Sequence, residues 1–260
     1  MISFIIPTWN TRAITQKCLD SIVKYLPPSK RQIIIIDNHS TDDSQTHFST
    51  QKGIVYRYLD QNYGYSYACN QGAKVASGDY FFFLNSDTEL QDDSCLSLIE
   101  KLDTDRQIGL IAPQLLNSDG TIQNSIFPPQ TPANAFRQFF LHIPNSYLPY
   151  SINLYSTNIA AVLGAAMLMS KSTFRRIRGW DEDFHFYYED LDLCRRLTTF
   201  GLKIAYDPGC RIYHHHGQSG KNIQTPANQW RRLIPSAKRY FGPVNYFLIQ
   251  AIIKASRLFS

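Results

Sequence analysis

The sequence lacks the features that mark secreted, disulfide-stapled or membrane-spanning proteins. Only 18% of its 260 residues are charged, yet no run of about 18 apolar residues occurs, so we expect no transmembrane helix. The five cysteines are scattered and form no C-x-x-C pair, which disfavours a disulfide scaffold and a zinc ribbon. No basic segment or small-residue cleavage site marks the first residues, so we expect no signal peptide and a cytoplasmic protein.

Two phosphate-binding motifs are also missing. The sequence contains neither G-x-G-x-x-G nor G-x-x-x-x-G-K-[ST], which disfavours a dinucleotide-binding fold and a P-loop. The net charge is only +5, and basic residues are not interleaved with aromatic ones in a recognisable module, so we expect no nucleic-acid partner. A phosphate-bearing ligand would therefore need another source of positive charge.

The hydrophobic pattern of residues 1–112 predicts an α/β domain. Short apolar runs typical of buried strands lie at 2–6, 33–36, 54–59, 80–84 and 108–112. Helical periodicity separates several of them, at 14–26, 70–76 and 94–102. This alternation predicts a mostly parallel central sheet with helices on both faces.

The second half is less regular. Residues 115–158 are rich in proline, asparagine and glutamine, and we interpret them as a long insertion or flap. Beyond it we expect strands at 162–170, 203–206 and 211–213 and helices at 173–177 and 187–200. We predict one domain over 1–220, made of halves 1–112 and 113–220, followed by a helical tail over 221–260.

Polar residues follow three of the predicted strands. They are Pro7-Thr8-Trp9-Asn10, Asp37 to Asp42, and Asn85-Ser86-Asp87. Ligands of open parallel sheets bind beyond the carboxyl ends of the strands, so we expect these groups to share one edge. The hard oxygen ligands at Asp87 suit Mg²⁺ or Mn²⁺, and Asp37 could accept hydrogen bonds from a base or ribose. The alternative is that these residues only form turns and helix caps.

The ordered set of motifs resembles family-two glycosyltransferases of the GT-A fold, and among them the rhamnosyltransferase-like subgroup. The first half supplies the strand-end residues above together with Asn62-x-Gly64 and Asn70-x-Gly72. The second half supplies Gly164-Ala165-Ala166, Gly179-Trp180-Asp181-Glu182-x-Phe184, Tyr188-Glu189-Asp190-x-Asp192-Leu193-Cys194-x-Arg196 and His214-His215-His216. The match covers roughly residues 2–220, and the order of its parts is far more specific than any one of them.

The resemblance implies a site for a nucleoside-diphosphate sugar. The residues it assigns there are Pro7, Thr8, Asn10, Asp37, Asn62, Gly64, Asn70, Asn85 and Ser86. The Asp-x-Asp metal motif of the family stands here as Asn85-Ser86-Asp87, so Asp87 alone supplies the anionic metal ligand. A later histidine completes the metal shell in several such enzymes, and the alternation of side chains along a strand favours His214 or His216.

The resemblance also implies the catalytic and acceptor residues. Asp190 corresponds to the general base that takes a proton from the acceptor hydroxyl, and Glu189 would hold the acceptor or tune its neighbour. Trp180, Asp181 and Glu182 would bind the acceptor, the alternative being a turn with a core tryptophan. For Asp192 and Arg196 we expect a structural role, an i,i+4 ion pair within the predicted helix.

The tail after residue 230 combines basic and apolar residues. Arg231-Arg232 and Lys238-Arg239 precede an apolar segment that also carries Lys254 and Arg257. Such a helix can lie in a membrane interface, and the alternatives are packing on the domain or a contact between copies of the chain. The resemblance adds to the first alternative, because such transferases often use lipid-linked acceptors at the cytoplasmic face of the inner membrane.

We therefore predict an inverting glycosyltransferase that uses Mg²⁺ or Mn²⁺. Its donor would be dTDP-rhamnose or a UDP-sugar, and its acceptor a hydroxyl of a growing surface glycan, plausibly polyprenyl-linked. A sugar-phosphate nucleotidyltransferase is the second hypothesis, although the segment 7–12 lacks the glycine- and lysine-rich loop of that class. A non-catalytic sugar- or nucleotide-binding module is the third.

Overall fold

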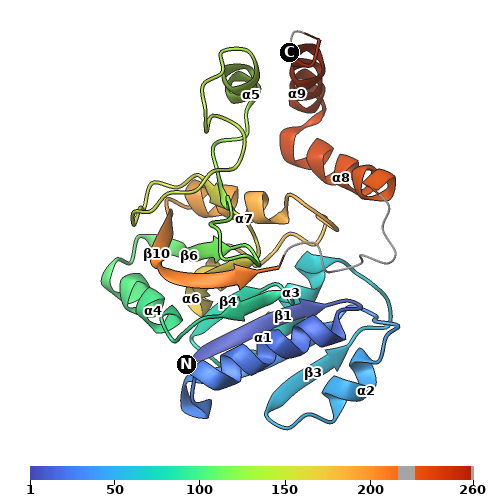
Figure 1. The fold of residues 1–260 in the computed structure, drawn as a ribbon, viewed down its shortest axis with the longest axis vertical. Helices are drawn as coiled ribbons and strands as arrows, with labels where there is room; N and C mark the ends of the chain where they lie inside the picture. The colour runs from blue at the N-terminus through green and yellow to red at the C-terminus, as the bar shows by residue number, and fades with distance from the viewer. Residues whose placement is uncertain (216–225, 259–260) are drawn as a thin grey trace.

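A computed structural model describes residues 1–215 and 226–258 of the chain. For residues 226–232 it describes the backbone alone. Its centre is an eight-stranded sheet in the order β3-β2-β1-β4-β9-β6-β10-β5 (Figure 1). The strands of this sheet are β1 (Ile2–Thr8), β2 (Arg31–Asp37), β3 (Ile54–Tyr58), β4 (Tyr80–Leu84), β5 (Thr88–Leu90), β6 (Ile108–Leu116), β9 (Ala166–Ser170) and β10 (Lys203–His214). A separate small ribbon pairs β7 (Ile126–Phe127) with β8 (Ala161–Val162).

The sheet is mostly parallel, as the alternation of strands and helices predicts. β1 runs parallel to β2 and β4, β2 to β3, and β6 to β10, whereas β9 and β5 pair antiparallel with their neighbours. The carboxyl ends of β1, β2, β4, β6 and β10 therefore lie along one edge. This edge carries Thr8, Asp37, the turn after Leu84, and His214.

Helices cover both faces of the sheet. The helices of the described residues are α1 (Arg12–Tyr25), α2 (Ser44–Ser49), α3 (Tyr65–Val75), α4 (Cys95–Thr104), α5 (Pro132–Phe139), α6 (Lys171–Arg176), α7 (Glu189–Thr199), α8 (Pro226–Phe241) and α9 (Pro243–Ser256), with a short 3-10 turn at Pro28–Lys30. One buried apolar layer contains residues of α1, α2 and α4, and the other contains residues of α3, α6 and α7. Alternate residues along β1 enter opposite layers, Ile5 one and Phe4 the other, which explains its continuous apolar run.

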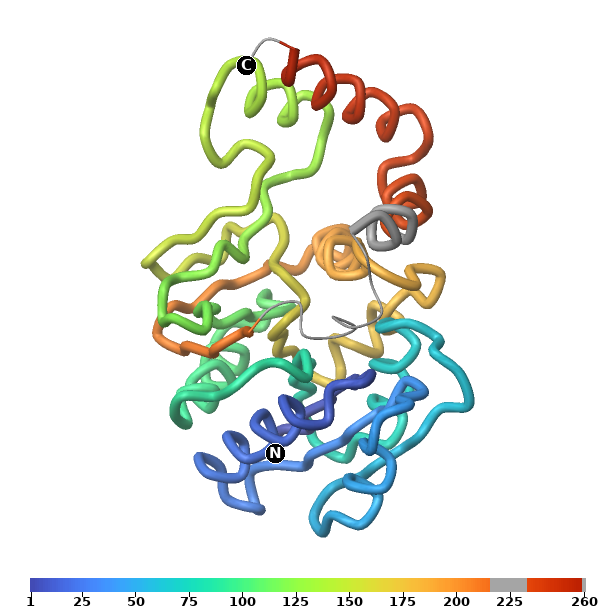
Figure 2. Tube along the Cα trace, turned by 45° about the vertical axis from the view of Figure 1, so that its right-hand side comes forward, coloured from blue at the N-terminus to red at the C-terminus, as the bar shows by residue number. Residues whose placement is uncertain are grey.

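Two elements stand apart from the sheet. α5 lies within the predicted insertion and packs against α9, and both project beyond the sheet at the end of the molecule farthest from the N-terminus (Figures 1 and 2). α5 begins at a proline in the first helical turn, and the Thr131 hydroxyl accepts a hydrogen bond from the Asn134 N–H. The proline-rich insertion thus contains a helix that its composition concealed.

Two predicted strand boundaries are wrong. The run 162–170 is not one strand, because Gly164 and Ala165 form a turn between β8 and β9, where the Ala165 carbonyl accepts the Asn85 N–H. Conversely, 203–206 and 211–213 belong to a single strand, β10. A register shift after Asp207 accommodates the Pro208-Gly209 pair, and the Asp207 carboxylate accepts the Gly209 N–H at 3.0 Å.

The cysteines are buried and reduced. Each is in the core, and burial raises the pKa of the Cys18, Cys194 and Cys210 thiols to about 12. Within the described segments, no helix has both the length and the apolar character needed to cross a bilayer.

Candidate active site

A cavity of about 390 Å³ opens beyond the carboxyl edge of the sheet. Its walls include the turns after β1, β2 and β4, the end of β10 and the start of α7. Phe127 and Gln130 of the insertion and Leu233 of α8 also contribute. The lining comprises Pro7, Thr8, Trp9, Asn38, Asn62, Tyr65, Asn85, Ser86, Asp87, Phe127, Gln130, Leu163, Gly164, Ala165, Phe186, Tyr187, Tyr188, Glu189, Asp190, Leu191, His214 and Leu233. Residues from both halves of the chain therefore meet at one place, as ligand binding at the edge of an α/β sheet requires.

Asp190 is held rigidly at the wall of this cavity. Its Oδ2 accepts the Gly164 N–H at 2.9 Å, and its Oδ1 accepts the Leu191 N–H at 2.8 Å. Burial raises the pKa of the Asp190 carboxyl, and the two backbone donors oppose this rise. A Cβ on Gly164 would lie 3.1 Å from the Asp190 Cβ, so the small residue lets the turn approach the carboxylate closely.

Glu189 has a different environment although it is adjacent in sequence. Its Oε2 is enclosed, and within residues 1–215 and 226–258 it has no hydrogen-bond partner. Burial, followed by repulsion from the Asp190 charge, raises the pKa of Glu189 to about 8. The raised pKa favours the neutral carboxylic acid at Glu189, whereas the two backbone N–H donors favour the carboxylate at Asp190.

Two further groups of the lining face each other. The Asp87 Oδ1 lies 3.4 Å from the His214 Nε2, and both side chains are almost fully buried. The His214 Nδ1 lies 2.7 Å from the Gln123 Oε1, so this nitrogen carries the proton and donates it to the amide oxygen. The other ring nitrogen, Nε2, faces the Asp87 carboxylate and the Asn85 amide, whose Nδ2 lies 3.4 Å away.

The donor chemistry of Asp87 and His214 fits a divalent cation. A carboxylate oxygen and an imidazole nitrogen with a fixed tautomer are both common ligands. Within the described residues no group of three histidine, cysteine or acidic side chains suited to a metal occurs. Mg²⁺ is usually held by only one or two protein carboxylates together with substrate phosphates, so the small ligand set of Asp87 and His214 is compatible with such a site.

The neighbouring histidines divide as the alternation of side chains along a strand predicts. His215 points away from the cavity, where its Nε2 lies 2.9 Å from Glu89 and its Nδ1 lies 2.7 Å from the Ser118 hydroxyl. His216, the second predicted metal ligand, lies outside the described residues.

The turn after β1 supports the cavity through hydroxyl groups. The Thr8 Oγ1 lies 2.8 Å from Thr11 and 3.0 Å from Thr15, and Thr11 continues to Ser86 at 3.1 Å. Pro7, Thr8 and Ser86 all line the cavity, so their predicted place beside a nucleotide sugar is compatible with this geometry.

Asn10 and Asp37 serve the scaffold of the same edge and do not line the cavity. The Asn10 Oδ1 accepts the N–H groups of Thr41 and Asp42, and Asn10 itself has a left-handed φ of 54°. The fully buried Asp37 accepts the Ser40 N–H and the Tyr56 hydroxyl, each at 2.7 Å. Their predicted contacts with a nucleotide stay predictions.

The loop before α3 is positioned by asparagines. Asn38 accepts the Tyr63 N–H at 2.9 Å and donates to the Gly64 carbonyl at 3.0 Å, while Asn62 accepts the Gly64 N–H at 3.0 Å. Gly64 has φ +88°, and a Cβ there would lie 2.4 Å from the His185 carbonyl oxygen. Asn62 lines the cavity, and Gly64 shapes the loop that brings it there.

The predicted acceptor residues have structural partners instead. Trp180 is 2% exposed and packs edge-to-face on Tyr65 and Phe83, so the core alternative describes it and no ring face is offered to a sugar. Asn70 donates to the Trp180 carbonyl and to Glu182, and it accepts the Trp180 N–H. None of Asn70, Trp180 or Glu182 lines the cavity.

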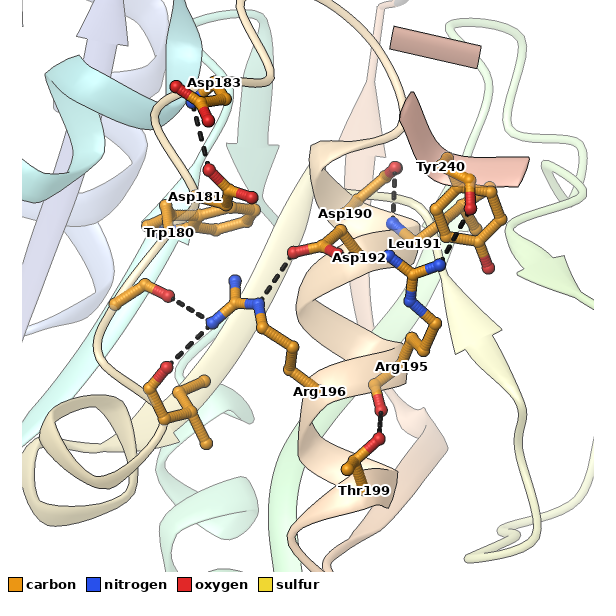
Figure 3. A network of polar contacts seen from close by, with 12 residues as sticks. Trp180, Asp181, Asp183, Asp190, Leu191, Asp192, Arg195, Arg196, Thr199 and Tyr240 are labelled. Atoms are coloured by element: carbon orange, nitrogen blue, oxygen red, sulfur yellow. Dashed lines mark hydrogen bonds and ion pairs between the residues drawn. The ribbon is translucent and has the colours of Figure 1, made fainter. Parts of the chain in front are cut away.

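The other charged residues of α7 form a network of polar contacts around the start of this helix (Figure 3). Asp192 forms ion pairs of 2.7 Å with both Arg195 and Arg196, which confirms its structural interpretation. Arg196 also donates to the Ile177 and Gly179 carbonyls. Asp181 pairs at 3.0 Å with Arg239 of α8, so it too lies away from the cavity lining.

Several residues of the site were not assigned a role from the sequence. The motif after β1 contains Trp9 but indicates no role for it, and Tyr65, whose hydroxyl donates to the Gly164 carbonyl, precedes the helix predicted from residue 70. Gln123 lies in an insertion without periodicity, so nothing in the pattern signals that it contacts His214. Such a contact depends on tertiary structure alone.

Comparison with known proteins identifies the family. The sequence profile of glycosyl transferase family 2 matches residues 3–178, more than half of the chain. This chain belongs to glycosyl transferase family 2. The resemblance inferred from the ordered motifs is thereby confirmed.

The curated relatives of this family-2 chain are distant and mostly longer. It is 23% identical over 247 residues to the O-antigen biosynthesis protein RfbC of Myxococcus xanthus, covering 93% of this chain and 19% of RfbC. It is 24% identical over 196 residues to the rhamnosyltransferase WbbL of Escherichia coli, covering 75% of this chain and 70% of WbbL. The chain spans only 48% of a matching poly-β-1,6-N-acetyl-D-glucosamine synthase of Staphylococcus epidermidis.

Solved structures share the fold. GalNAc-T7 with UDP, GalNAc and Mn²⁺ aligns with a TM-score of 0.64 at 16% identity, covering 90% of this chain and 47% of that one. Staphylococcus aureus TarS in complex with UDP aligns with a TM-score of 0.59 at 14% identity, and the alignment covers 93% of this chain and 65% of the TarS chain. The predicted GT-A architecture is therefore confirmed.

Proposed function

We propose that this chain transfers a sugar, with inversion, from a nucleoside-diphosphate sugar to a hydroxyl group of a glycan. The observation that carries the proposal is the presence of two complementary groups in one cavity. Asp190 has a positioned carboxylate, and Asp87 with His214 would hold a cation. A direct displacement needs one base for the attacking hydroxyl and one positive charge for the departing diphosphate.

Each step of the transfer has a residue in the cavity. The Asp190 carboxylate accepts the proton of the acceptor hydroxyl as that oxygen attacks the anomeric carbon, and the bond from this carbon to the diphosphate oxygen breaks. Its two backbone donors keep the carboxylate oriented during the step. Glu189, as a neutral acid, donates a hydrogen bond to a sugar oxygen. The cation, when bound by Asp87 and His214, supplies positive charge against the diphosphate.

The donor class follows from the relatives. WbbL is a rhamnosyltransferase, and both aligned solved structures contain UDP. We therefore propose dTDP-rhamnose or a UDP-sugar as the donor, and a cell-surface polysaccharide intermediate carried on a polyprenyl lipid as the acceptor. The buried, reduced cysteines are consistent with reaction in the cytoplasm.

A donor screen tests this proposal. Thermal unfolding is measured with dTDP-rhamnose, UDP-sugars and the free nucleotides, each with and without Mn²⁺. A true donor binds the folded state and raises the melting temperature, more so with the cation. If no nucleotide sugar shifts the transition and none is hydrolysed or transferred, the proposed function is wrong.

A further inference from the structure

The outer surface of α5 and α9 is apolar where a helix surface in water is normally polar. We define the distal platform as residues 132–148 and 243–258. Along α9 the buried side is formed by Tyr246 and Ile249, while the side facing solvent is apolar as well. The exposed apolar residues of the platform are Phe136, Leu141, Ile143, Leu148, Val244, Phe247, Leu248 and Leu258.

The exposed residues of α9 follow helical spacing. Val244 lies three residues before Phe247 and four before Leu248, so these side chains form one stripe along the helix, and Leu258 lies just beyond its end. The same stripe includes Lys254 near its end. This stripe and the exposed residues of α5 stand at the same end of the molecule, beyond the sheet (Figure 2).

The charge of this end has a single sign. No aspartate or glutamate occurs in residues 121–180 or after Asp207. The exposed cations of the platform and the adjoining end of α8 are Arg137, Lys238, Arg239, Lys254 and Arg257, of which Arg239 is paired with Asp181 and Asp183. Lys238 lies over the rings of Tyr246 and Phe247, where its charge and the apolar surface meet.

These observations select one partner. We propose that the distal platform docks the protein onto an anionic phospholipid surface, with its apolar residues in the interface and its cations against lipid head groups. A second copy of the chain would bring cations against cations with no carboxylate to pair them, whereas anionic lipids supply that negative charge. No described helix can span the bilayer, which is consistent with association at its surface.

The platform is connected to the cavity through α8. Leu233 lines the cavity, and the Ser236 hydroxyl donates at 2.7 Å to the Phe186 carbonyl in the loop before Glu189. Docking would therefore hold the cavity at a fixed distance from the membrane, where a lipid-linked acceptor is available. This consequence rests on the proposed transfer, but docking itself does not.

Vesicle binding of the full chain tests the proposal without any sugar nucleotide, so its outcome is separate from that of the transfer reaction. The probes are vesicles of phosphatidylglycerol mixed with phosphatidylcholine and vesicles of phosphatidylcholine alone. We expect co-sedimentation with the first, weakening as salt is added, and little with the second. Equal binding to both, or none to either, overturns the proposal.

Variants locate the surface. Phe247→Ser/Leu248→Ser should lower the partition onto anionic vesicles by about ten-fold or more, because both side chains are exposed and available to the interface. The matched control is Leu154→Ser, an exposed leucine outside the platform that should change nothing. An equal loss in the control overturns the assignment of this surface.

Charge variants give a second, independent measurement. Lys254→Gln/Arg257→Gln should lower binding about 25-fold, since a basic residue near the surface contributes about 1 kcal/mol, or about five-fold. The control Lys52→Gln/Arg57→Gln removes two exposed cations near β3 and should have little effect. Circular dichroism confirms that all variants are folded. The proposal would be overturned if the wild-type chain did not bind vesicles and formed, in sedimentation velocity, a dimer that Phe247→Ser/Leu248→Ser abolishes. A second copy of the chain would then be the partner.

Discussion

The His214 Nε2 lies 3.4 Å from the Asp87 Oδ1, although His214 ends β10 and Asp87 lies in the turn after β4. β4 and β10 are separated in the sheet by β9 and β6, and only the common direction of β4 and β10 brings their carboxyl ends to one edge. The pairing of His214 with Thr88 in the antiparallel β10–β5 contact then sets the distance. This relationship between a carboxylate and an imidazole is the basis of the first prediction.

His214→Ala should weaken Mn²⁺ binding by at least about ten-fold, because it removes one of two protein ligands. A Mn²⁺ titration followed by electron paramagnetic resonance measures the affinity. His215→Ala is the matched control, since that ring points to Glu89 and Ser118 and should leave Mn²⁺ affinity unchanged. Equal weakening in both variants would contradict the assignment.

Asp190→Asn should lower the rate of transfer by about 10²–10⁴-fold while nucleotide-sugar affinity changes little, because the amide cannot accept the proton. Transfer is measured by release of the nucleoside diphosphate and affinity by calorimetry. Since an amide nitrogen would face one of the two backbone N–H groups, we also expect a loss of about 1–3 kcal/mol in unfolding free energy.

Asp183→Asn is the control for that experiment, because Asp183 is exposed and does not line the cavity. It should retain transfer. Near-normal turnover in Asp190→Asn would show that another group accepts the proton.

Glu189→Gln should change how stability depends on pH. The folded-state pKa of Glu189 is about 8 and its ordinary value is 4.5, so between these values the folded state holds a proton that the unfolded state has released. Wild-type stability therefore falls as pH rises from about 5 to 8 on account of this group. The glutamine variant lacks this loss and should gain stability relative to wild type over that range, as measured by urea unfolding.

Glu100→Gln, at an exposed position, provides the baseline for the same titration. A constant difference between Glu189→Gln and wild type from pH 5 to pH 8 would contradict the raised pKa.

Asn70→Ala should reduce stability more than donor affinity. The side chain makes three hydrogen bonds to Trp180 and Glu182 and does not line the cavity, so its loss should lower the unfolding free energy by about 1–3 kcal/mol. Asn62→Ala should instead reduce donor affinity more than stability, because Asn62 does line the cavity. If Asn70→Ala weakened donor binding most, the predicted role of Asn70 at the donor would be restored.

The sequence predicts the elements whose hydrophobic pattern is local. Ile33–Ile36 and Tyr80–Leu84 are continuous buried runs, and the structure contains strands there. The motifs at the ends of β1 and β4 likewise predict part of the cavity, since parallel strands bring their carboxyl ends together. The antiparallel position of β9 between β4 and β6 could not be predicted, because strand order is a tertiary property.

Other differences arise where a residue can serve two environments. Trp180 follows a turn motif, and only its contacts with Tyr65 and Phe83 show that it belongs to the core. Asp181 and Asn70 are polar residues whose partners come from distant segments. The two adjacent acids of α7 have similar sequence context, and burial raises the pKa of both, but only the folded chain gives Asp190 the backbone donors of Gly164 and Leu191 that oppose this rise.

The burial of all five cysteines has a practical consequence for experiments on this chain. The native thiols of the folded protein should react very slowly with maleimide dyes, since each thiol is shielded from solvent and burial raises the pKa of each one. A single cysteine introduced at Val244 would then take up an environment-sensitive dye selectively, without removal of any native thiol. The fluorescence of that dye would follow the approach of α9 to lipid in real time.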